Sequence, residues 1–81
     1  MDDMERQLIR CFAVIFPHLD ETVIQRATME SVEGWDSVAT VTLISVAEEE
    51  FRIQIDPEDL EELVSFSQFL NYLRNRVAAQ K

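Results

Sequence analysis

Apolar residues recur every three or four positions in two stretches of the chain, and this spacing predicts two amphipathic helices. The first covers residues 2–16, where the apolar stripe consists of Met4, Leu8, Cys11, Phe12 and Ile15. The second covers residues 66–78, where one face carries Phe66, Phe69, Leu70, Leu73 and Val77. Pro17 disfavours helical geometry in the residue before it and ends the first helix. Ser65 is placed to cap the second.

Residues 37–51 give conflicting signals. Six of them are β-branched and favour a strand, namely Val38, Thr40, Val41, Thr42, Ile44 and Val46. Against this, Asp36 or Ser37 can serve as the N-cap of a helix. A helical face is also spaced correctly, through Leu43, Ile44, Ala47 and Phe51. The capping residues and the spacing favour a helix over residues 37–51.

A long connection, residues 18–36, follows the first helix. We expect one short helix in it, over residues 21–27 with Asp20 as its cap, because a wholly irregular loop of this length is uncommon. That helix should direct three apolar side chains inward, those of Val23, Ile24 and Ala27.

Residues 51–56 alternate apolar and polar side chains, as an extended segment does. No second segment has a matching pattern, so we predict an extended crossing and no sheet. Asp56 and Pro57 then form a helix start, with the aspartate as N-cap and the proline in the first position. This third helix is short and should end near Leu63.

Length and charge narrow the class of protein. Eighty-one residues make one domain, residues 1–81, with a modest core. The net charge of −9 repels phosphate backbones and anionic lipids, which argues against nucleic acid and membrane surfaces as partners. Nine acids and one base, Arg52, lie in residues 36–62. Basic patches on other proteins are the natural counterpart of this acidic segment.

The chain has one cysteine, Cys11, so it cannot form an internal disulfide, which fits a reducing compartment. No apolar run reaches the length of a membrane span, and the acidic N-terminus does not resemble a signal peptide. We therefore expect a cytoplasmic monomer.

The residues needed for catalysis are missing. A serine nucleophile such as Ser37 needs a general base within hydrogen-bonding reach, and the only histidine, His18, has nothing to orient it. One cysteine and one histidine cannot build a zinc site, and the acids of residues 56–62 lack the glycine and spacing of a calcium loop. The sequence therefore predicts neither an enzyme nor a metal site.

Ser37 is better placed as the target of a modification. A phosphodiester on its hydroxyl would lie at a helix N-terminus, where free N–H groups and the helix dipole favour an anion. Asp36 could help to ligate the metal ion of the attaching enzyme, and Gly34, the only glycine, allows a sharp turn. The simpler interpretation is that Ser37 merely caps the helix, because an Asp-Ser pair is common in proteins.

The arrangement as a whole resembles the acyl carrier proteins. The resemblance rests on Gly34-Trp35-Asp36-Ser37-Val38, on Ala47-Glu48-Glu49-Glu50-Phe51, on the acidic segment that follows, and on Leu70-Asn71-Tyr72-Leu73. In that family the serine of an Asp-Ser-Leu motif carries 4′-phosphopantetheine, whose thiol holds acyl groups as thioesters. The resemblance implies that Ser37 is the attachment site. It also implies an all-α four-helix bundle with three longer helices, a short third helix and a long first loop.

The resemblance also indicates which residues meet partner enzymes, namely a phosphopantetheinyl transferase, a loading ligase and acyl-transferring enzymes. The residues expected to contact them are Asp36, Val38, Val41, Glu48 and Glu49. Carriers of ordinary fatty acid synthesis typically have acids soon after the serine, whereas residues 39–42 here are uncharged. This difference, with Trp35 before the aspartate, favours a dedicated carrier in a specialised lipid or secondary-metabolite pathway.

Bulky rings suggest the nature of the cargo. Four of them could fill the space between the later helices, where the family holds its acyl chains, and these are Phe51, Phe66, Phe69 and Tyr72. We therefore expect short or polar cargo. Two other functions stay open on the sequence alone: an aminoacyl or peptidyl carrier loaded by an adenylating ligase, and an unmodified acidic helical adaptor that only binds proteins.

Overall fold

Helices make up the ordered framework of the protein. A computed structural model describes residues 3–79, without the side chain of Ala79. Three long helices, α1 (Asp3–Ile15), α3 (Ser37–Phe51) and α4 (Phe66–Ala79), are joined by a short α2 (Glu21–Gln25) and a 3-10 helix, η1 (Pro57–Glu62). The described residues form no strand, so the all-α prediction is confirmed. Asp2, expected at the start of the first helix, lies outside the described residues.

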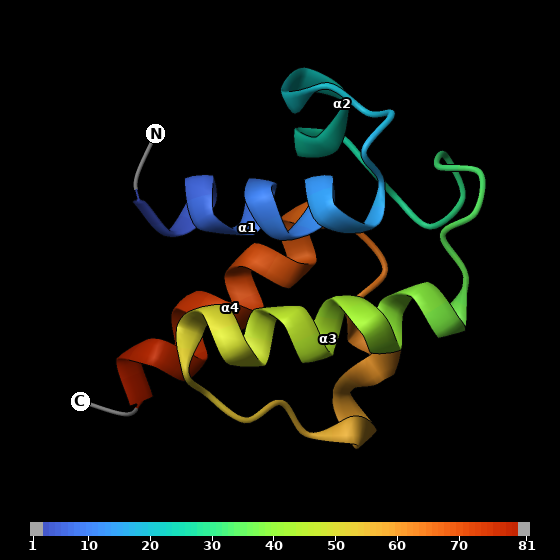
Figure 1. Ribbon diagram of the computed structural model, residues 1–81. Helices are drawn as coiled ribbons and strands as arrows, with labels where there is room; N and C mark the ends of the chain where they lie inside the picture. The colour runs from blue at the N-terminus through green and yellow to red at the C-terminus, as the bar shows by residue number, and fades with distance from the viewer. Residues whose placement is uncertain (1–2, 80–81) are drawn as a thin grey trace.

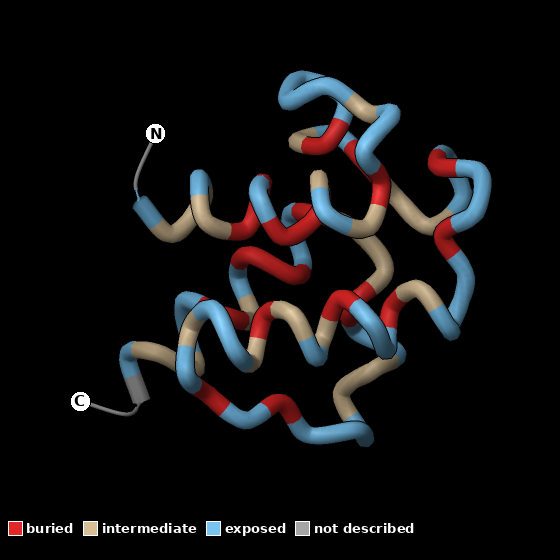
Figure 2. Tube along the Cα trace, in the orientation of Figure 1, coloured by how far each residue is buried: buried red, intermediate tan, exposed pale blue. Residues whose placement is uncertain are grey.

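The three long helices pack around one core. In Figure 1, α1 and α3 lie one above the other and run in opposite directions, while α4 passes behind them. α1 contacts each of the other α-helices. Figure 2 shows that the buried residues form stripes along α1, α3 and α4 and also occur in the connections. The core is therefore shared between helices and loops.

An aromatic cluster occupies the centre of this core. The fully buried Phe12 ring makes edge contacts at centroid distances of 5.3 Å with Trp35, 5.3 Å with Phe66 and 5.8 Å with Phe69. Phe16 lies 6.4 Å from the same ring. Edge-to-face pairs of this kind add about 0.5–1.5 kcal/mol each beyond the burial of their area. The cluster links α1 to the loop before α3 and to the start of α4.

Side-chain caps begin the helices where the sequence predicts them. The Asp20 carboxylate accepts the N–H three residues further on in α2, at 2.9 Å. The Asp56 carboxylate accepts the N–H two residues further on in η1, at 3.0 Å, and Pro57 fills the first position there. The Ser65 hydroxyl accepts an N–H of α4 at 3.2 Å. Each cap satisfies a donor that the helix itself leaves without a partner.

One inward side chain was predicted wrongly. Ile24 and Ala27 are buried, but Val23 is 45% exposed. Consecutive residues of a helix lie about 100° apart around its axis, so the five-residue α2 turns Ile24 to the core and Val23 away from it. Ala27 reaches the core after the helix has ended, where its carbonyl accepts the Phe66 N–H at 3.0 Å.

The first connection is tied to the start of α4. Thr28 and Ser65 form an isolated antiparallel bridge, and the Met29 N–H donates to the Val64 carbonyl at 2.8 Å. Val32 is buried and packs the connection against the core. Within residues 3–79, every helix is too short or too polar to cross a membrane.

Candidate functional site

Ser37 is the first residue of α3 and is exposed. The residue before it, Asp36, is the cap of the helix, because its Oδ1 accepts the Ala39 N–H at 2.9 Å. The interpretation of Ser37 as a plain cap is therefore wrong. Within the described residues, the Ser37 hydroxyl has no hydrogen-bond partner. It is free to carry a substituent.

The backbone around Ser37 suits a negatively charged group. Asp36 takes two donors of the first turn: its carboxylate binds the Ala39 N–H and its carbonyl binds the Thr40 N–H at 3.0 Å. The N–H groups of Ser37 and Val38 bind no acceptor in the part of the chain that the structure describes. N–H groups of this kind, together with the helix dipole, stabilise an anion at a helix N-terminus. A phosphodiester on the Ser37 oxygen fits this position.

A sharp turn precedes the site. Gly34 has a φ of +93°, in the left-handed region that residues with a side chain avoid. A Cβ at Gly34 would meet nothing within 4 Å, so the glycine is required by the backbone conformation and not by lack of space. The Trp35 N–H then donates to the Val32 carbonyl at 3.2 Å. The turn brings the chain from the core to the exposed Ser37 within three residues.

Two buried residues near Ser37 were not identified as part of the site from the sequence. Trp35 is 3% exposed, and its Nε1–H donates to the Thr40 Oγ1 at 2.8 Å. Thr40 is fully buried, and its Oγ1 donates in turn to the Asp36 carbonyl at 3.1 Å. A signal was present, because Thr40 lies three residues before Leu43 on the buried face of α3 and a buried hydroxyl needs a partner.

The residues expected to contact partners differ in exposure. Val38 is 74% exposed and Val41 is 52% exposed, and both Asp36 and Glu49 lie at the surface. From Ser37 to Ala47 α3 carries no charge, so the face beside Ser37 is apolar and hydroxylic.

Glu48 is the exception among these residues. It is only partly exposed, and its Oε2 accepts the Ile55 N–H at 2.8 Å. This bond holds the extended segment after α3 against the helix. A groove of about 510 Å³ lies beside it, lined by Ser45, Val46, Glu48, Glu49, Ile53 and Gln54.

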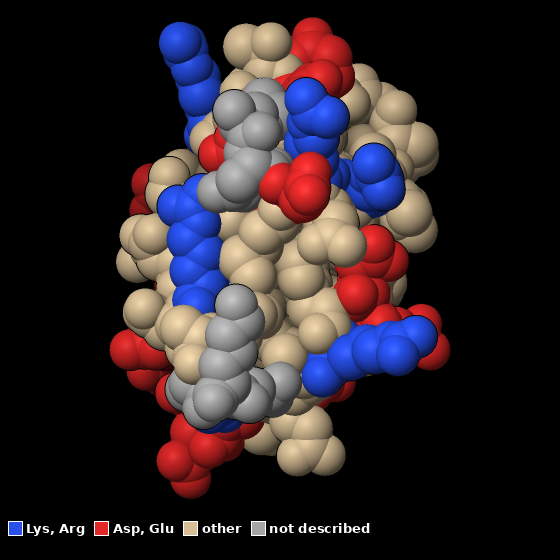
Figure 3. Space-filling view, turned by 90° about the vertical axis from the view of Figure 1, so that its left-hand side faces the viewer, with Lys and Arg blue, Asp and Glu red and all other residues tan. Residues whose placement is uncertain are grey.

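Charged residues of both signs lie at the end of the molecule remote from Ser37 (Figure 3). The start of α1 and the ends of α3 and α4 lie together at the left of Figure 1, while α3 begins at the right. These three segments carry four bases and five acids, namely Arg6, Arg52, Arg74 and Arg76, and Asp3, Glu5, Glu48, Glu49 and Glu50. Figure 3 shows Arg side chains standing around this end, with Asp and Glu side chains among them and uncharged residues between. At the end with Ser37, the acid Asp36 lies beside the uncharged part of α3.

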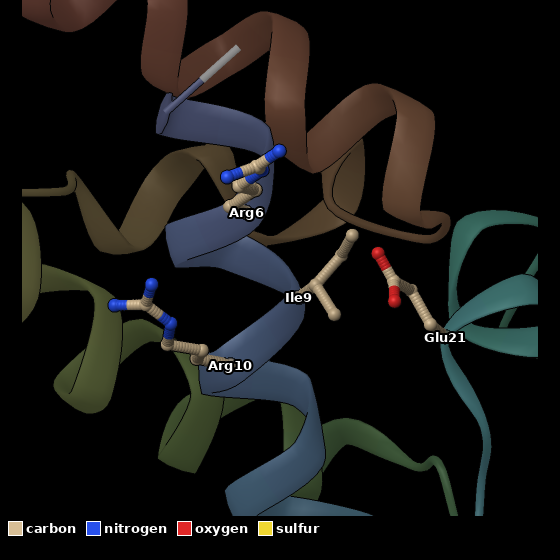
Figure 4. Close-up of a pocket in the computed structure, with 4 residues that line it drawn as sticks. All are labelled: Arg6, Ile9, Arg10 and Glu21. Carbon is tan, nitrogen blue, oxygen red and sulfur yellow. The ribbon is translucent and has the colours of Figure 1, made fainter. Parts of the chain in front are cut away.

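A second hollow, of about 430 Å³, lies on α1 and α2 and is lined by Arg6, Ile9, Arg10 and Glu21. Figure 4 shows Ile9 directed towards Glu21 and Arg10 directed to the other side of α1. None of these residues belongs to the segment 34–40 that surrounds Ser37.

The aromatic rings that were expected to fill the cargo region have different positions. Phe66 and Phe69 are buried against Phe12. Phe51 and Tyr72 are only partly buried. Two of the four rings therefore belong to the central core.

Among the residues that the structure describes, no histidine is bonded to Ser37. His18 is exposed and its ring packs on Phe16 at 6.3 Å, and within residues 3–79 no hydrogen bond joins it to Ser37. The described residues also contain no group of three or more His, Cys, Asp and Glu side chains that could hold a metal ion. The site can accept and present a group.

The sequence of this chain is similar to those of known carrier proteins. The family model for the phosphopantetheine attachment site matches residues 6–73. An acyl carrier protein of Desulforapulum autotrophicum is 38% identical over 56 residues, covering 69% of this chain and 73% of that protein. One of Thermosynechococcus vestitus is 36% identical over 59 residues, covering 73% of each. One of Buchnera aphidicola subsp. Schizaphis graminum is 29% identical over 76 residues, covering 94% and 96%. No solved structure matches significantly.

The match over residues 6–73 places the chain in the class of carriers that receive a phosphopantetheine arm. The chain belongs to the acyl carrier protein family. Members of this family are carriers and not enzymes, their cofactor is 4′-phosphopantetheine, and they interact with phosphopantetheinyl transferases and acyl-handling enzymes.

Proposed function

We propose that Ser37 carries the 4′-phosphopantetheine arm and that the chain presents acyl groups on it to partner enzymes. The observation that carries this proposal is the exposed Ser37 hydroxyl, which has no hydrogen-bond partner among the described residues because Asp36 caps the helix. When bound, the arm supplies a thiol that holds acyl groups as thioesters. The protein supplies the helix start that holds the phosphodiester.

The pathway we propose is a specialised one in lipid or secondary metabolism. The uncharged stretch from Ser37 to Ala47 supports it, because a partner would meet Val38 and Val41 before it meets an acid of α3. The acids Asp36, Glu48 and Glu49 would flank this contact, although one oxygen of Glu48 is occupied by the Ile55 N–H. We propose a loading ligase and acyl-transferring enzymes as the partners and short or polar groups as the cargo.

The whole chain acts as one domain in this proposal, as a monomer in the cytoplasm. Its arrangement is a four-helix bundle of α1, α3, η1 and α4, in which η1 is the short third helix and α2 belongs to the long first loop. The presence of three long helices and one short 3-10 helix in this order supports the assignment.

Attachment of the arm is the direct test. The chain without the arm is incubated with coenzyme A, Mg²⁺ and a broad-specificity phosphopantetheinyl transferase, and intact mass is measured. We expect a gain of one 4′-phosphopantetheine group in the wild type and none in Ser37→Ala. Ser45→Ala, which removes another exposed serine of α3, is the matched control and should gain the group. A wild type without the added mass, or an equal gain in Ser37→Ala, refutes the proposal.

Loading assays then separate the kinds of cargo. Acyl donors and aminoacyl donors are offered to the modified chain, each with its own class of ligase. Transfer from the acyl donors supports the function proposed here. Transfer from an adenylated amino acid alone would make the chain an aminoacyl or peptidyl carrier, and a chain that never accepts the arm would fit an adaptor.

A further inference from the structure

A closed set of hydrogen bonds surrounds Ser37 without using its side chain. The Trp35 Nε1–H donates to the Thr40 Oγ1 at 2.8 Å, and the Thr40 Oγ1 donates to the Asp36 carbonyl at 3.1 Å. The Asp36 carboxylate then binds the Ala39 N–H at 2.9 Å. These bonds join the residues on both sides of Ser37 to one another. The first turn of α3 is therefore fixed from residue 35 to residue 40.

The core anchors one end of this set. The Trp35 indole is 3% exposed and lies edge-on to Phe12 at 5.3 Å and at 6.1 Å from Phe16. Thr40 has no exposed surface. A hydrogen bond between two buried groups is hard for water to replace, so it holds its geometry better than an exposed one. The backbone on both sides of Ser37 is thus held against the aromatic core through Trp35.

We propose that Trp35 and Thr40 are positioning residues, which hold the Ser37 hydroxyl in place for attachment of the phosphopantetheine arm. This inference rests on the proposed function of Ser37. Neither side chain is available to an enzyme docked on the surface, because both are buried. They act through the backbone of Asp36 and Ser37.

The attachment reaction shows why position matters. The Ser37 oxygen bonds to the phosphorus that bears the arm in coenzyme A, the bond from that phosphorus to the nucleotide breaks, and adenosine 3′,5′-bisphosphate leaves. The serine proton passes to a base of the transferase. The attacking oxygen must be in line with the leaving oxygen, and a small misplacement of a reacting atom lowers the rate of such a step steeply.

Two substitutions remove the bond from either side, and of these Thr40→Val is nearly isosteric while Trp35→Phe leaves a smaller ring. Trp35→Phe keeps a ring in the core but removes the donor, and Thr40→Val keeps the shape of the side chain but removes the hydroxyl. We expect both to lower kcat for arm attachment by about tenfold, with little change in the KM for the carrier, because the docking surface is intact. Thr40→Ser restores the hydroxyl and should restore kcat.

A matched core variant separates positioning from general loss of stability. Leu73→Val removes one methylene from a fully buried residue of α4, outside the set of bonds around Ser37. The assays are run well below the melting temperature of every variant, so that all of them are folded. Under these conditions Leu73→Val should be modified at the wild-type kcat. If kcat falls as much in Leu73→Val as in Thr40→Val, then Trp35 and Thr40 only stabilise the fold and the proposal is wrong.

The tryptophan signal gives a readout that needs no arm. Trp35 is the only tryptophan, so its indole N–H gives a single side-chain resonance in the ¹H–¹⁵N spectrum. We expect slow exchange of this proton in the wild type and in Thr40→Ser, and faster exchange with a shifted resonance in Thr40→Val. An unchanged indole resonance in Thr40→Val shows that the bond does not form, and overturns the proposal.

The two levels of the proposal fail in different ways. A wild type that never accepts the arm removes the function proposed for Ser37, and the positioning role with it. A wild type that accepts the arm, with Trp35→Phe and Thr40→Val modified at the same kcat, leaves the function intact and removes only the positioning role.

Discussion

The Tyr72 hydroxyl donates to an Asp59 carboxylate oxygen at 2.5 Å and so joins α4 to η1. The same hydroxyl accepts the Asp56 N–H at 3.4 Å. No residue of η1 itself is fully buried, and the apolar anchor of this helix is its C-cap residue, the fully buried Leu63. The tyrosine adds a polar link between η1 and the rest of the protein.

Tyr72→Phe removes this link and keeps the ring. We expect the free energy of unfolding to fall by about 1 kcal/mol, as for a typical intramolecular hydrogen bond, and the amides of η1 to exchange faster. Asp59→Asn is the partner variant for a double-mutant cycle measured by denaturant unfolding. Additive effects of the two substitutions would show that the hydroxyl and the carboxylate do not interact.

The same residue predicts a dependence on alkaline pH. Burial in the first place, and then the bond to Asp59, raise the pKa of Tyr72 above its ordinary value of 10.0. The folded state therefore holds the proton more tightly than the unfolded state. This stabilisation is complete below pH 10 and is lost as the pH rises through the folded pKa. Unfolding titrations should show a smaller alkaline loss in Tyr72→Phe, and equal losses in both proteins would contradict the assignment.

Cys11 should not react with thiol reagents in the native protein. Burial, and to a smaller extent the nearby charge of Glu50, raise the pKa of this thiol from 9.0 to about 11. Because the thiolate is the reactive form, an Ellman assay at pH 8 should detect no thiol in the native chain without the arm and one after unfolding. With the arm attached, the native protein should show one thiol, that of the arm. Rapid reaction of Cys11 in the native chain would contradict its burial.

Gly34→Ala should destabilise the loop before α3. The φ of +93° at this position strains any residue with a Cβ, and the expected loss is about 1 kcal/mol in the free energy of unfolding. Gly34→Asn is the control, because asparagine tolerates the left-handed region better than alanine and should lose less. If both variants match the wild type in denaturant unfolding, the turn does not require a positive φ.

The exposed valines of α3 should contribute to recognition by the transferase. The double variant Val38→Asn/Val41→Asn removes the apolar contact next to Ser37. We expect the KM for the carrier to rise roughly tenfold, because the complex loses buried apolar area equal to about one valine side chain. Val14→Asn changes a valine of α1 that is 68% exposed, close to the 74% of Val38. It should leave the KM unchanged, and an equal rise in both proteins would point to a non-specific effect.

Local sequence predicts the helix starts of this protein well. The aspartates and the serine that begin α2, η1 and α4 bind N–H groups two or three residues away, so the geometry is contained in a few neighbouring residues. The same reasoning allowed both Asp36 and Ser37 as the cap of α3. In the structure Asp36 is the cap, because its side chain accepts the Ala39 N–H.

Contacts that depend on the packing of whole helices could not be predicted in this way. The charge of Glu48 indicates a surface residue, but the folded chain returns to it and occupies one oxygen with the Ile55 N–H. The β-branched side chain of Thr40 disfavours a helix in local terms, whereas its hydroxyl is a buried partner of Trp35 in the folded chain. Val23 has an apolar side chain that the short α2 turns outward.

Asp36 caps the helix and Ser37 does not, and this division of roles has a consequence for the cycle of loading and unloading. Because the aspartate alone holds the helix start, esterification of the serine breaks no bond of the described scaffold. The chain without the arm, the chain with the arm and the chain with an acyl group on the arm would then share the same backbone conformation around Ser37. An enzyme that distinguishes these forms would have to contact the arm and its acyl group directly, since the conformation of the first turn of α3 would be the same in all of them.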